Sequence, residues 1–339
     1  MNENLSVVIL AAGKGTRMKS DRAKVLHEVF FLPMIHHVLA AAAPLQADRT
    51  LVIVGHQRQA VSAAIAGFKA ETVVQEEQLG TGHAVLLTEK AIPPGTGEVM
   101  ILCGDAPLLR PETLATMLAR HRASGAACTL MTTNLADPYG YGRILTATDG
   151  KIIGIVEEKD ATPAQKAMKT INAGIYLVNR DPLFTALSSV DRNNAQGEFY
   201  LTDIVEKIVK SGQTVAEFVN PDPDEVLGVN SRVELALAHA EIQRRRNRAL
   251  MLAGVSMEQP ESIAVALSAH IEPDCALEPG VRLLGKTSLG RGCRIGQGAI
   301  LTDCQIGANV EIGAYCCLTG MEIGAGDTIA ALTSGLAGK

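Results

Sequence analysis

The stretch Val7-Val8-Ile9-Leu10-Ala11-Ala12-Gly13-Lys14-Gly15-Thr16-Arg17-Met18 decides the fold of the N-terminal part of the chain. Its apolar start, rich in Val and Ile, is typical of a strand buried on both faces of a parallel sheet. The two glycines that follow let backbone N–H groups turn inward, and Arg and Lys side chains add positive charge, so the loop can hold phosphate oxygens. A dinucleotide fingerprint would need a third glycine where Met18 stands, and a Walker loop would need Gly-Lys-Ser/Thr at its end, which Lys14-Gly15-Thr16 does not provide.

Length and composition exclude several classes of protein. The 339 residues give room for two domains, and 47% hydrophobic content indicates a packed core. A net charge of −5 with 3% aromatic residues argues against a nucleic-acid partner. Apolar runs such as 39–45 are too short to span a membrane, and the start at Met1 lacks the basic residues of a signal peptide, so we predict a cytoplasmic protein. The seven cysteines form no C-x-x-C pair, which argues against a zinc site.

Short apolar strands alternate with amphipathic segments up to about Val229, which predicts an α/β domain with a mostly parallel sheet and its ligands at the carboxyl ends of the strands. The predicted strands are Val7–Leu10, Thr50–Val54, Thr72–Gln75, Val99–Leu102, Ala127–Thr132, Ile152–Val156, Ile175–Val178 and Thr214–Phe218. The predicted helices are Pro33–Ala43, Arg58–Ala66 and Pro111–Ser124.

The string from Leu10 to Met18, followed by Lys24, resembles the signature of the nucleotide-sugar pyrophosphorylases, which join a nucleoside triphosphate to a sugar 1-phosphate. The resemblance implies a Rossmann-like nucleotidyltransferase domain in which Arg17 and Lys24 are catalytic and contact phosphates. It also implies that the loop residues Leu10, Ala11, Ala12 and Gly13 bind the nucleotide. Arg22-Ala23 replaces the usual Leu-Pro before the lysine, so this loop loses the rigidity of proline.

Further segments match the same family one by one, and the resemblance implies a role for each. Gln75 and the pair Gly80-Thr81 would contact the base and its sugar, since an amide suits the uracil imide. Asp105 would be a catalytic metal ligand at the end of a buried strand. The remaining implied binding residues are Cys103, Gly104, Gly142, Glu157, Asn172 and Asn230. Two matches depart from the family: Cys103 stands where an aromatic residue is usual, and Ala173 replaces a threonine.

The segment from Asn193 to Asp203 resembles one branch of that family, the N-acetylglucosamine-1-phosphate uridylyltransferases. The implied reaction joins UTP and N-acetylglucosamine 1-phosphate into UDP-N-acetylglucosamine and pyrophosphate, without a covalent enzyme intermediate. Mg²⁺ would be held by Asp105 and Asn230, and Asn230 can also cap the helix that follows it. Two alternatives stay open: a related nucleotidyltransferase with another sugar or nucleotide, and an inactive nucleotide-sugar-binding protein with a role in assembly.

A different periodicity begins near Ala266. Eleven aliphatic residues recur every five or six positions, several followed by glycine, which predicts a hexapeptide-repeat β-helix of about four coils. We therefore predict three parts: a nucleotidyltransferase domain (1–230), a linker helix (231–253) and the β-helix (254–339). By resemblance the β-helix is left-handed and the protein a homotrimer. Bifunctional relatives continue into further coils that carry glucosamine-1-phosphate acetyltransferase chemistry, so we expect no acetyltransferase activity here.

Overall fold

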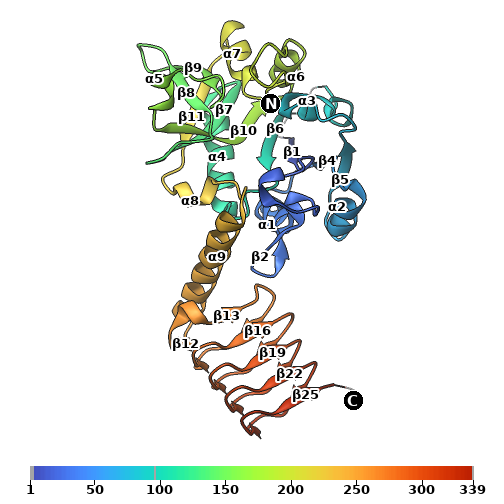
Figure 1. Cartoon of the computed structure of the whole chain (residues 1–339), viewed down its shortest axis with the longest axis vertical. Coiled ribbons are helices and arrows are strands. Elements are labelled where there is room, and N and C mark those ends of the chain that lie inside the picture. The colour runs from blue at the N-terminus through green and yellow to red at the C-terminus, as the bar shows by residue number, and fades with distance from the viewer. Residues whose placement is uncertain (1–3, 95–96, 338–339) are drawn as a thin grey trace. The chain divides into compact units, whose positions relative to one another are not determined.

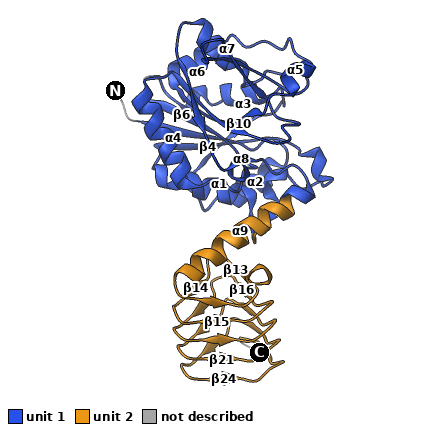
Figure 2. Cartoon of the chain, turned by 90° about the vertical axis from the view of Figure 1, so that its left-hand side faces the viewer, with its two compact units in different colours: residues 1–28, 32–234 blue, residues 29–31, 235–339 orange. Residues whose placement is uncertain are grey.

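The computed structural model describes residues 4–94 and 97–337. The chain divides into two compact units (Figure 2): Met1–Glu28 with Leu32–Glu234 form unit 1, and Val29–Phe31 with Leu235–Lys339 form unit 2. The first three residues, on which the expectation of a missing signal peptide depends, lie outside the described part. Each unit has its own hydrophobic core.

A nine-stranded sheet forms the centre of unit 1 within the described residues (Figure 1). Its main path runs β11-β7-β10-β6-β1-β4-β5, and β8 and β9 extend it beside β10. β1 pairs in parallel with β4 and β6, whereas β10 runs antiparallel to β6 and β7, so the sheet is mixed and mostly parallel as predicted. The strands are β1 (Leu5–Leu10), β4 (Arg49–Val54), β5 (Glu71–Val74), β6 (Glu98–Cys103), β7 (Cys128–Asn134), β8 (Arg143–Thr146), β9 (Ile152–Val156), β10 (Thr170–Asn179) and β11 (Val215–Val219).

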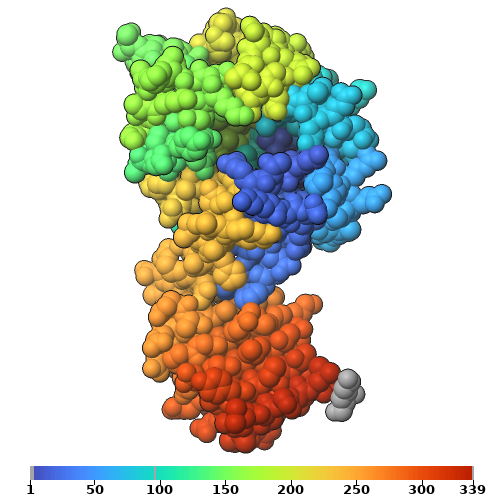
Figure 3. Space-filling view, viewed as in Figure 1, coloured from blue at the N-terminus to red at the C-terminus, as the bar shows by residue number. Residues whose placement is uncertain are grey.

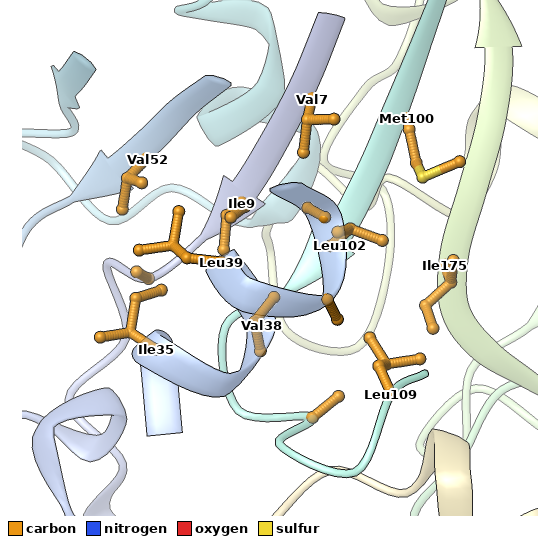
Figure 4. Packing of buried hydrophobic residues seen from close by; sticks show 14 of the residues in the cluster. Val7, Ile9, Ile35, Val38, Leu39, Val52, Met100, Leu102, Leu109 and Ile175 are labelled. Carbon is orange, nitrogen blue, oxygen red and sulfur yellow. The ribbon is translucent and has the colours of Figure 1, made fainter. Parts of the chain in front are cut away.

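Helices cover both faces of this sheet. On one face, Val7 and Ile9 of β1 share a buried cluster with Ile35 and Val38 of α1, and Figure 4 shows the α1 side chains turned toward the strands. On the other face, Val8 packs in a second cluster with residues of α3, α6 and α7. Burying one such aliphatic side chain contributes about 1.5–3 kcal/mol, which explains why the buried positions of β1 are apolar apart from Ser6. The helices of unit 1 are α1 (Met34–Ala42), α2 (Arg58–Ile65), α3 (Thr81–Leu86), α4 (Pro111–Ser124), α5 (Pro163–Lys166), α6 (Arg180–Leu187), α7 (Asp203–Lys210) and α8 (Pro223–Val226).

The predicted elements of unit 1 are confirmed, and α4 begins and ends as predicted. Pro111 at its first position and Gly125 at its C-cap (φ 65°) mark both ends. Most ends of the other elements shift by one or two residues, but β10 begins at Thr170, ahead of the strand predicted from Ile175. One strand of the sheet was not predicted: β8 begins at Arg143 and pairs with β9 and β10. A further short pair, β2 (Glu28–Val29) and β3 (Leu32–Pro33), was not anticipated either.

Unit 2 contains most of α9 (Arg232–Leu252) and a parallel β-helix. Its strands form three parallel sheets of five, five and four strands in the described residues, with orders β12-β15-β18-β21-β24, β13-β16-β19-β22-β25 and β14-β17-β20-β23. Figure 1 shows the coils stacked one on another, as expected of a left-handed β-helix. The strands are β12 (Ser256–Met257), β13 (Ala264–Val265), β14 (His270–Ile271), β15 (Ala276–Leu277), β16 (Arg282–Leu284), β17 (Ser288–Leu289), β18 (Arg294–Ile295), β19 (Ile300–Thr302), β20 (Gln305–Ile306), β21 (Glu311–Ile312), β22 (Cys317–Thr319), β23 (Glu322–Ile323), β24 (Thr328–Ile329) and β25 (Ser334–Leu336).

The hexapeptide pattern places one aliphatic residue of each face in the interior. Leu277, Ile295 and Ile312 lie in register on successive coils and are buried together. The first strand of the β-helix begins at Ser256, ahead of the regular aliphatic repeat that starts near Ala266, and the first two strands carry Met257 and Val265. Cys275, Cys293, Cys304 and Cys316 fill interior positions as small buried side chains with free thiols.

Candidate active site

A cavity of about 360 Å³ opens in unit 1 at the carboxyl ends of β1 and β6. Figure 3 shows this face of unit 1 hollowed where the dark-blue N-terminal part of the chain meets the cyan and green parts. Many of the predicted site residues line the cavity: Leu10, Ala11, Ala12, Gly13, Lys24, Gln75, Gly80, Thr81, Cys103 and Asp105. Gly104 lies just behind the wall, where its N–H donates to the carbonyl of Leu10 (3.0 Å).

Lys24 joins the charged residues beside this cavity. Its ammonium contacts the Asp105 carboxylate, which lies 81 residues further along the chain, and donates to Oδ1 of Asn230 at 2.6 Å, 206 residues away. Arg17 donates to the same Oδ1 at 2.8 Å. The four residues predicted to contact phosphates and metal are therefore brought together, although no local pattern in the sequence connects them.

The backbone around this cluster holds Lys24 and Asp105 in place. Gly15 adopts φ 64°, and a Cβ there would lie 2.6 Å from Cβ of Lys24, so only glycine lets the lysine pass so close to the loop. On the other side, the N–H of Val229 donates to the carbonyl of Asp105 (2.8 Å).

The hydrogen bond that caps α9 comes from Ser231, not from Asn230. The hydroxyl of Ser231 accepts from the N–H of Glu234 at 3.2 Å, and the Glu234 carboxylate accepts from the N–H of Asn230 at 2.6 Å. The first bond is an N-cap hydrogen bond, and the second holds the backbone of the residue before the cap. Because Ser231 takes the capping role, the amide oxygen of Asn230 can face Lys24 and Arg17.

The chemistry of Asp105 and Asn230 fits a magnesium ion. Both present hard oxygens to one cationic group, the Lys24 ammonium, so the two oxygens lie within reach of a single positive charge. In the part of the chain that the structure describes, no three His, Cys, Asp or Glu side chains form a metal-binding group. Mg²⁺ needs only one or two protein oxygens, because it completes its shell with substrate phosphates and water.

One wall of the cavity joins the loop before α3 to the segment predicted from the uridylyltransferase resemblance. The N–H of Phe199 donates to Leu79 and its carbonyl accepts from Gly82, both at 2.8 Å. Gln75 is buried next to this loop. Its Nε2 lies 3.1 Å from the Gly80 carbonyl and 3.2 Å from Nδ1 of His83. His83, which sequence reasoning left out, therefore helps to orient this amide.

The remaining predicted residues, Gly142, Glu157 and Asn172, form a second cluster. A Cβ on Gly142 would lie 3.6 Å from Oε2 of Glu157 and 3.7 Å from Cβ of Asn172, so the three residues are close neighbours. Asn172 Oδ1 accepts from the N–H of Gly174 (3.1 Å), and Cys103 Sγ donates to the Gly174 carbonyl (3.4 Å). The cysteine on the cavity wall thus connects the two clusters through the β10 bulge.

Burial controls the ionisation of two groups here. Burial, assisted by Asp105 and opposed by Lys24, raises the pKa of Cys103 to about 12, so this thiol stays protonated and is no nucleophile at neutral pH. Burial also raises the pKa of Glu157, with Asp203 and Asp160 acting in the same direction and the Thr202 hydroxyl opposing them. This half-buried carboxyl favours ligands that donate hydrogen bonds to it.

Sequence reasoning missed several residues of this region. Gln78 and Glu198 line the cavity, and Nε2 of Gln78 donates to the carbonyl of Ala12 at 2.8 Å. Tyr141 is half-buried close to Asp105 and Gly228, and burial, with the negative charges of Glu234 and Asp105, raises its pKa to about 12. All three lie in segments that were matched to the family. A polar residue in a loop has no periodic pattern, however, that would identify it as part of the site.

Asp203, the first residue of α7, is expected to make folding stability depend on pH. Burial, with the nearby charges of Asp191 and Glu206, raises its pKa from 3.8 to about 6. The folded state therefore binds more protons than the unfolded state between these values, so the contribution of Asp203 is present below about pH 4 and is lost as the pH rises through about 6. Asp203→Asn should raise the free energy of unfolding at pH 7 by a few tenths to about 1 kcal/mol, since solvent screening and the helix dipole reduce the effect.

Urea unfolding of both proteins at pH 4 and pH 7 measures this difference. The variant should gain stability over the wild type only at pH 7. An equal difference at the two pH values would show that the carboxyl does not titrate as described.

Comparison with known proteins decides the family. The sequence profile described as nucleotidyl transferase matches residues 6–224, which include every element of the sheet in unit 1. The chain belongs to the nucleotidyl transferase family. This confirms the family assignment that rested on the glycine loop and Lys24.

Similar proteins of this family bear the name "Bifunctional protein GlmU". The protein from Desulfotalea psychrophila is 53% identical over 96% of this chain and 96% of its own length. Those from Geobacter metallireducens and Syntrophotalea carbinolica are 46% and 44% identical, and this chain spans 63% and 69% of their lengths. The absence of acetyltransferase activity stays a prediction. No helix among the described residues is long and apolar enough to cross a membrane.

Proposed function

We propose that this nucleotidyl transferase joins UTP and N-acetylglucosamine 1-phosphate into UDP-N-acetylglucosamine and pyrophosphate. The observation that carries the proposal is the ammonium of Lys24 in contact with both Asp105 and Asn230, at the edge of a cavity whose wall is the glycine loop. Cations and inward-facing N–H groups suit a triphosphate, whereas two hard oxygens suit its metal.

The reaction is an in-line displacement at the α-phosphorus. An oxygen of the sugar phosphate forms the new P–O bond, and the bond to the β-phosphate breaks, so that pyrophosphate leaves with the electron pair. No proton has to be removed from the attacking phosphate oxygen, because it is ionised at neutral pH. The protein therefore contributes positioning and electrostatic stabilisation rather than acid–base chemistry.

The residues of the charged cluster divide this work. Lys24 and Arg17 face the phosphate oxygens, and Asn230 fixes both cations through one amide oxygen. Mg²⁺ held by Asp105 and Asn230 would neutralise charge on the phosphates as the leaving group departs. The glycine loop adds N–H donors without side chains that would fill the cavity.

The base side of the cavity favours uracil. The amide nitrogen of Gln75 is held by Gly80 and His83, which turns the amide oxygen into the group that we assign to the ligand. Uracil donates from its ring N–H to such an oxygen, whereas the corresponding nitrogen of cytosine is an acceptor and would leave the buried Gln75 oxygen unpaired.

The sugar side fits a ligand rich in hydroxyl and amide groups. Glu157 supplies a half-buried carboxyl, and Asn172 lies beside it with its Nδ2 donating to the Tyr176 hydroxyl at 2.6 Å. A Cβ at Gly142 would lie 2.9 Å from Cγ2 of Ile155, so glycine lets this turn pass close to β9 beside Glu157 and Asn172.

Pyrophosphate release tests the proposal directly. The purified chain with Mg²⁺, UTP and N-acetylglucosamine 1-phosphate should release pyrophosphate, and CTP or glucose 1-phosphate should lower kcat/KM by at least about ten-fold, because each leaves buried polar groups unpaired. Release with another pair of substrates only would point to a related nucleotidyltransferase. No release from any pair, with UDP-N-acetylglucosamine still bound, would favour a binding protein instead.

A cytoplasmic location and a homotrimer formed through the β-helix belong to the same proposal. Sedimentation of the full chain would measure the oligomeric state.

A further inference from the structure

Arg143 is a buried cation that the proposed reaction does not use. Its side chain is 1% exposed at the first position of β8, and it ranks among the largest fully buried side chains of the described residues. A buried guanidinium is costly unless hydrogen bonds compensate its charge. Its Nη1 donates to the carbonyl of Tyr141, while Nη2 donates to Oε2 of Glu158 at 2.7 Å and to the carbonyl of Lys166 at 3.3 Å.

These bonds connect the backbone on two sides of the second cluster. The Tyr141 carbonyl directly precedes Gly142, and Glu158 directly follows Glu157. Glu158 also accepts from the N–H of Gly140 at 3.4 Å, so one ion pair holds both the 140–142 turn and the end of β9.

The third member of the cluster is tied to the same turn. The N–H of Asn172 donates to the Gly142 carbonyl at 2.9 Å, and Ile171, its neighbour, pairs with Arg143 between β10 and β8. Moving the turn would therefore displace Gly142 and Asn172 together relative to Glu157.

We propose that Arg143 and Glu158 are a positioning pair that sets the spacing of Gly142, Glu157 and Asn172, and thereby the affinity for the sugar half of the substrate. This inference rests on the proposed function, since it assumes that the second cluster binds the sugar. Displacing residues that position a substrate by about 1 Å can reduce the rate of catalysis by up to about 10²-fold.

The pair is not required simply to fill space. The Nε of Arg143 is buried and has no hydrogen-bond partner among the described residues, so the guanidinium is not fully compensated. Removing one member of a buried ion pair normally costs stability, because the charge of its partner is left unpaired. Here that cost is reduced, because the Glu158 side chain is 18% exposed and lies 3.7 Å from the Lys166 ammonium. Arg143→Met is therefore expected to fold, with the turn free to shift.

Steady-state kinetics of Arg143→Met test the pair. The KM for N-acetylglucosamine 1-phosphate should rise by about ten-fold or more, while the KM for UTP stays within about two-fold, because the nucleotide wall is held by other contacts. Glu158→Gln removes the charge but keeps the shape, so it should move the same KM in the same direction; it decides the matter if Arg143→Met is insoluble.

Arg180→Met is the matched control. Arg180 is also a buried arginine of unit 1 that donates to a backbone carbonyl (Ile92, 3.1 Å) and a carboxylate (Asp181, 3.0 Å), but it contacts neither cluster. Its replacement should lower the Tm without changing the KM for the sugar phosphate. An unchanged sugar-phosphate KM in both Arg143→Met and Glu158→Gln, or equal increases in both KM values, would overturn the positioning role.

Binding measurements separate this inference from the proposed function. If the wild type releases no pyrophosphate, the proposed reaction is wrong. Calorimetry with UDP-N-acetylglucosamine then still tests whether Arg143 and Glu158 position the second cluster. A Kd about ten-fold weaker for Arg143→Met than for the wild type would support it, and equal Kd values would overturn it.

Discussion

Replacing Asp105 by asparagine is expected to lower kcat for pyrophosphate release by about 10²–10³-fold, the range found when one group that stabilises transition-state charge is removed. Asparagine keeps the shape of the side chain and one oxygen but removes its negative charge. The Lys24 ammonium then loses its ionic partner beside Asn230, and the oxygen pair assigned to Mg²⁺ loses its only carboxylate. Both changes act on the phosphates, so the effect should fall on kcat more than on the sugar-phosphate KM.

The metal assignment can be tested apart from turnover. Mn²⁺ binding to the protein–UTP complex, followed by electron paramagnetic resonance, should weaken in Asp105→Asn. Asp149→Asn, which alters an exposed carboxylate paired with Lys151, is the control and should change neither kcat nor Mn²⁺ binding. A fully active Asp105→Asn protein with an unchanged Tm would sink the assignment of Asp105 to the metal and the phosphates.

The fold could be predicted from the sequence wherever a residue type or pattern is compatible with only one kind of local structure. The Val-Ile run of β1 must be buried on both faces, Pro111 and Gly125 mark the ends of α4, and the aliphatic repeat can only stack as a β-helix. The short β8 had no such signal, because glycines precede it and only four residues make the strand. The joining of Val29–Phe31 to unit 2 depends on contacts with residues such as His239 and Arg282, which are too distant in sequence to be inferred from a pattern.

The candidate site could be predicted only in part from the sequence. The resemblance supplied Lys24, Asp105 and Asn230 one at a time, whereas their meeting at one ammonium is a property of the folded chain. Arg143 shows the limit most clearly. No sequence pattern marked this residue, because its burial and its bond to Glu158 depend on β8, a strand that was not predicted.

Replacing Gly80 by alanine should lower the free energy of unfolding by about 3 kcal/mol or more, the size expected from a strained backbone together with a steric clash. Gly80 adopts φ 114°, and a Cβ there would lie 2.5 Å from the carbonyl oxygen and 2.8 Å from the nitrogen of Phe199. Phe199 cannot move aside easily, because its N–H and carbonyl are held by Leu79 and Gly82. The strain should therefore open the base side of the cavity and raise the KM for UTP.

Gly125→Ala is the control that distinguishes the backbone strain of a positive φ from the steric clash of the new Cβ. Gly125 also has a positive φ (65°), but a Cβ there would meet nothing within 4 Å, so this variant should lose only about 1–2 kcal/mol of stability and no affinity for UTP. Urea unfolding and UTP titration of the two variants give the comparison. If Gly80→Ala proved no less stable than Gly125→Ala, the close approach of the α3 loop to Phe199 could not be what shapes the nucleotide wall.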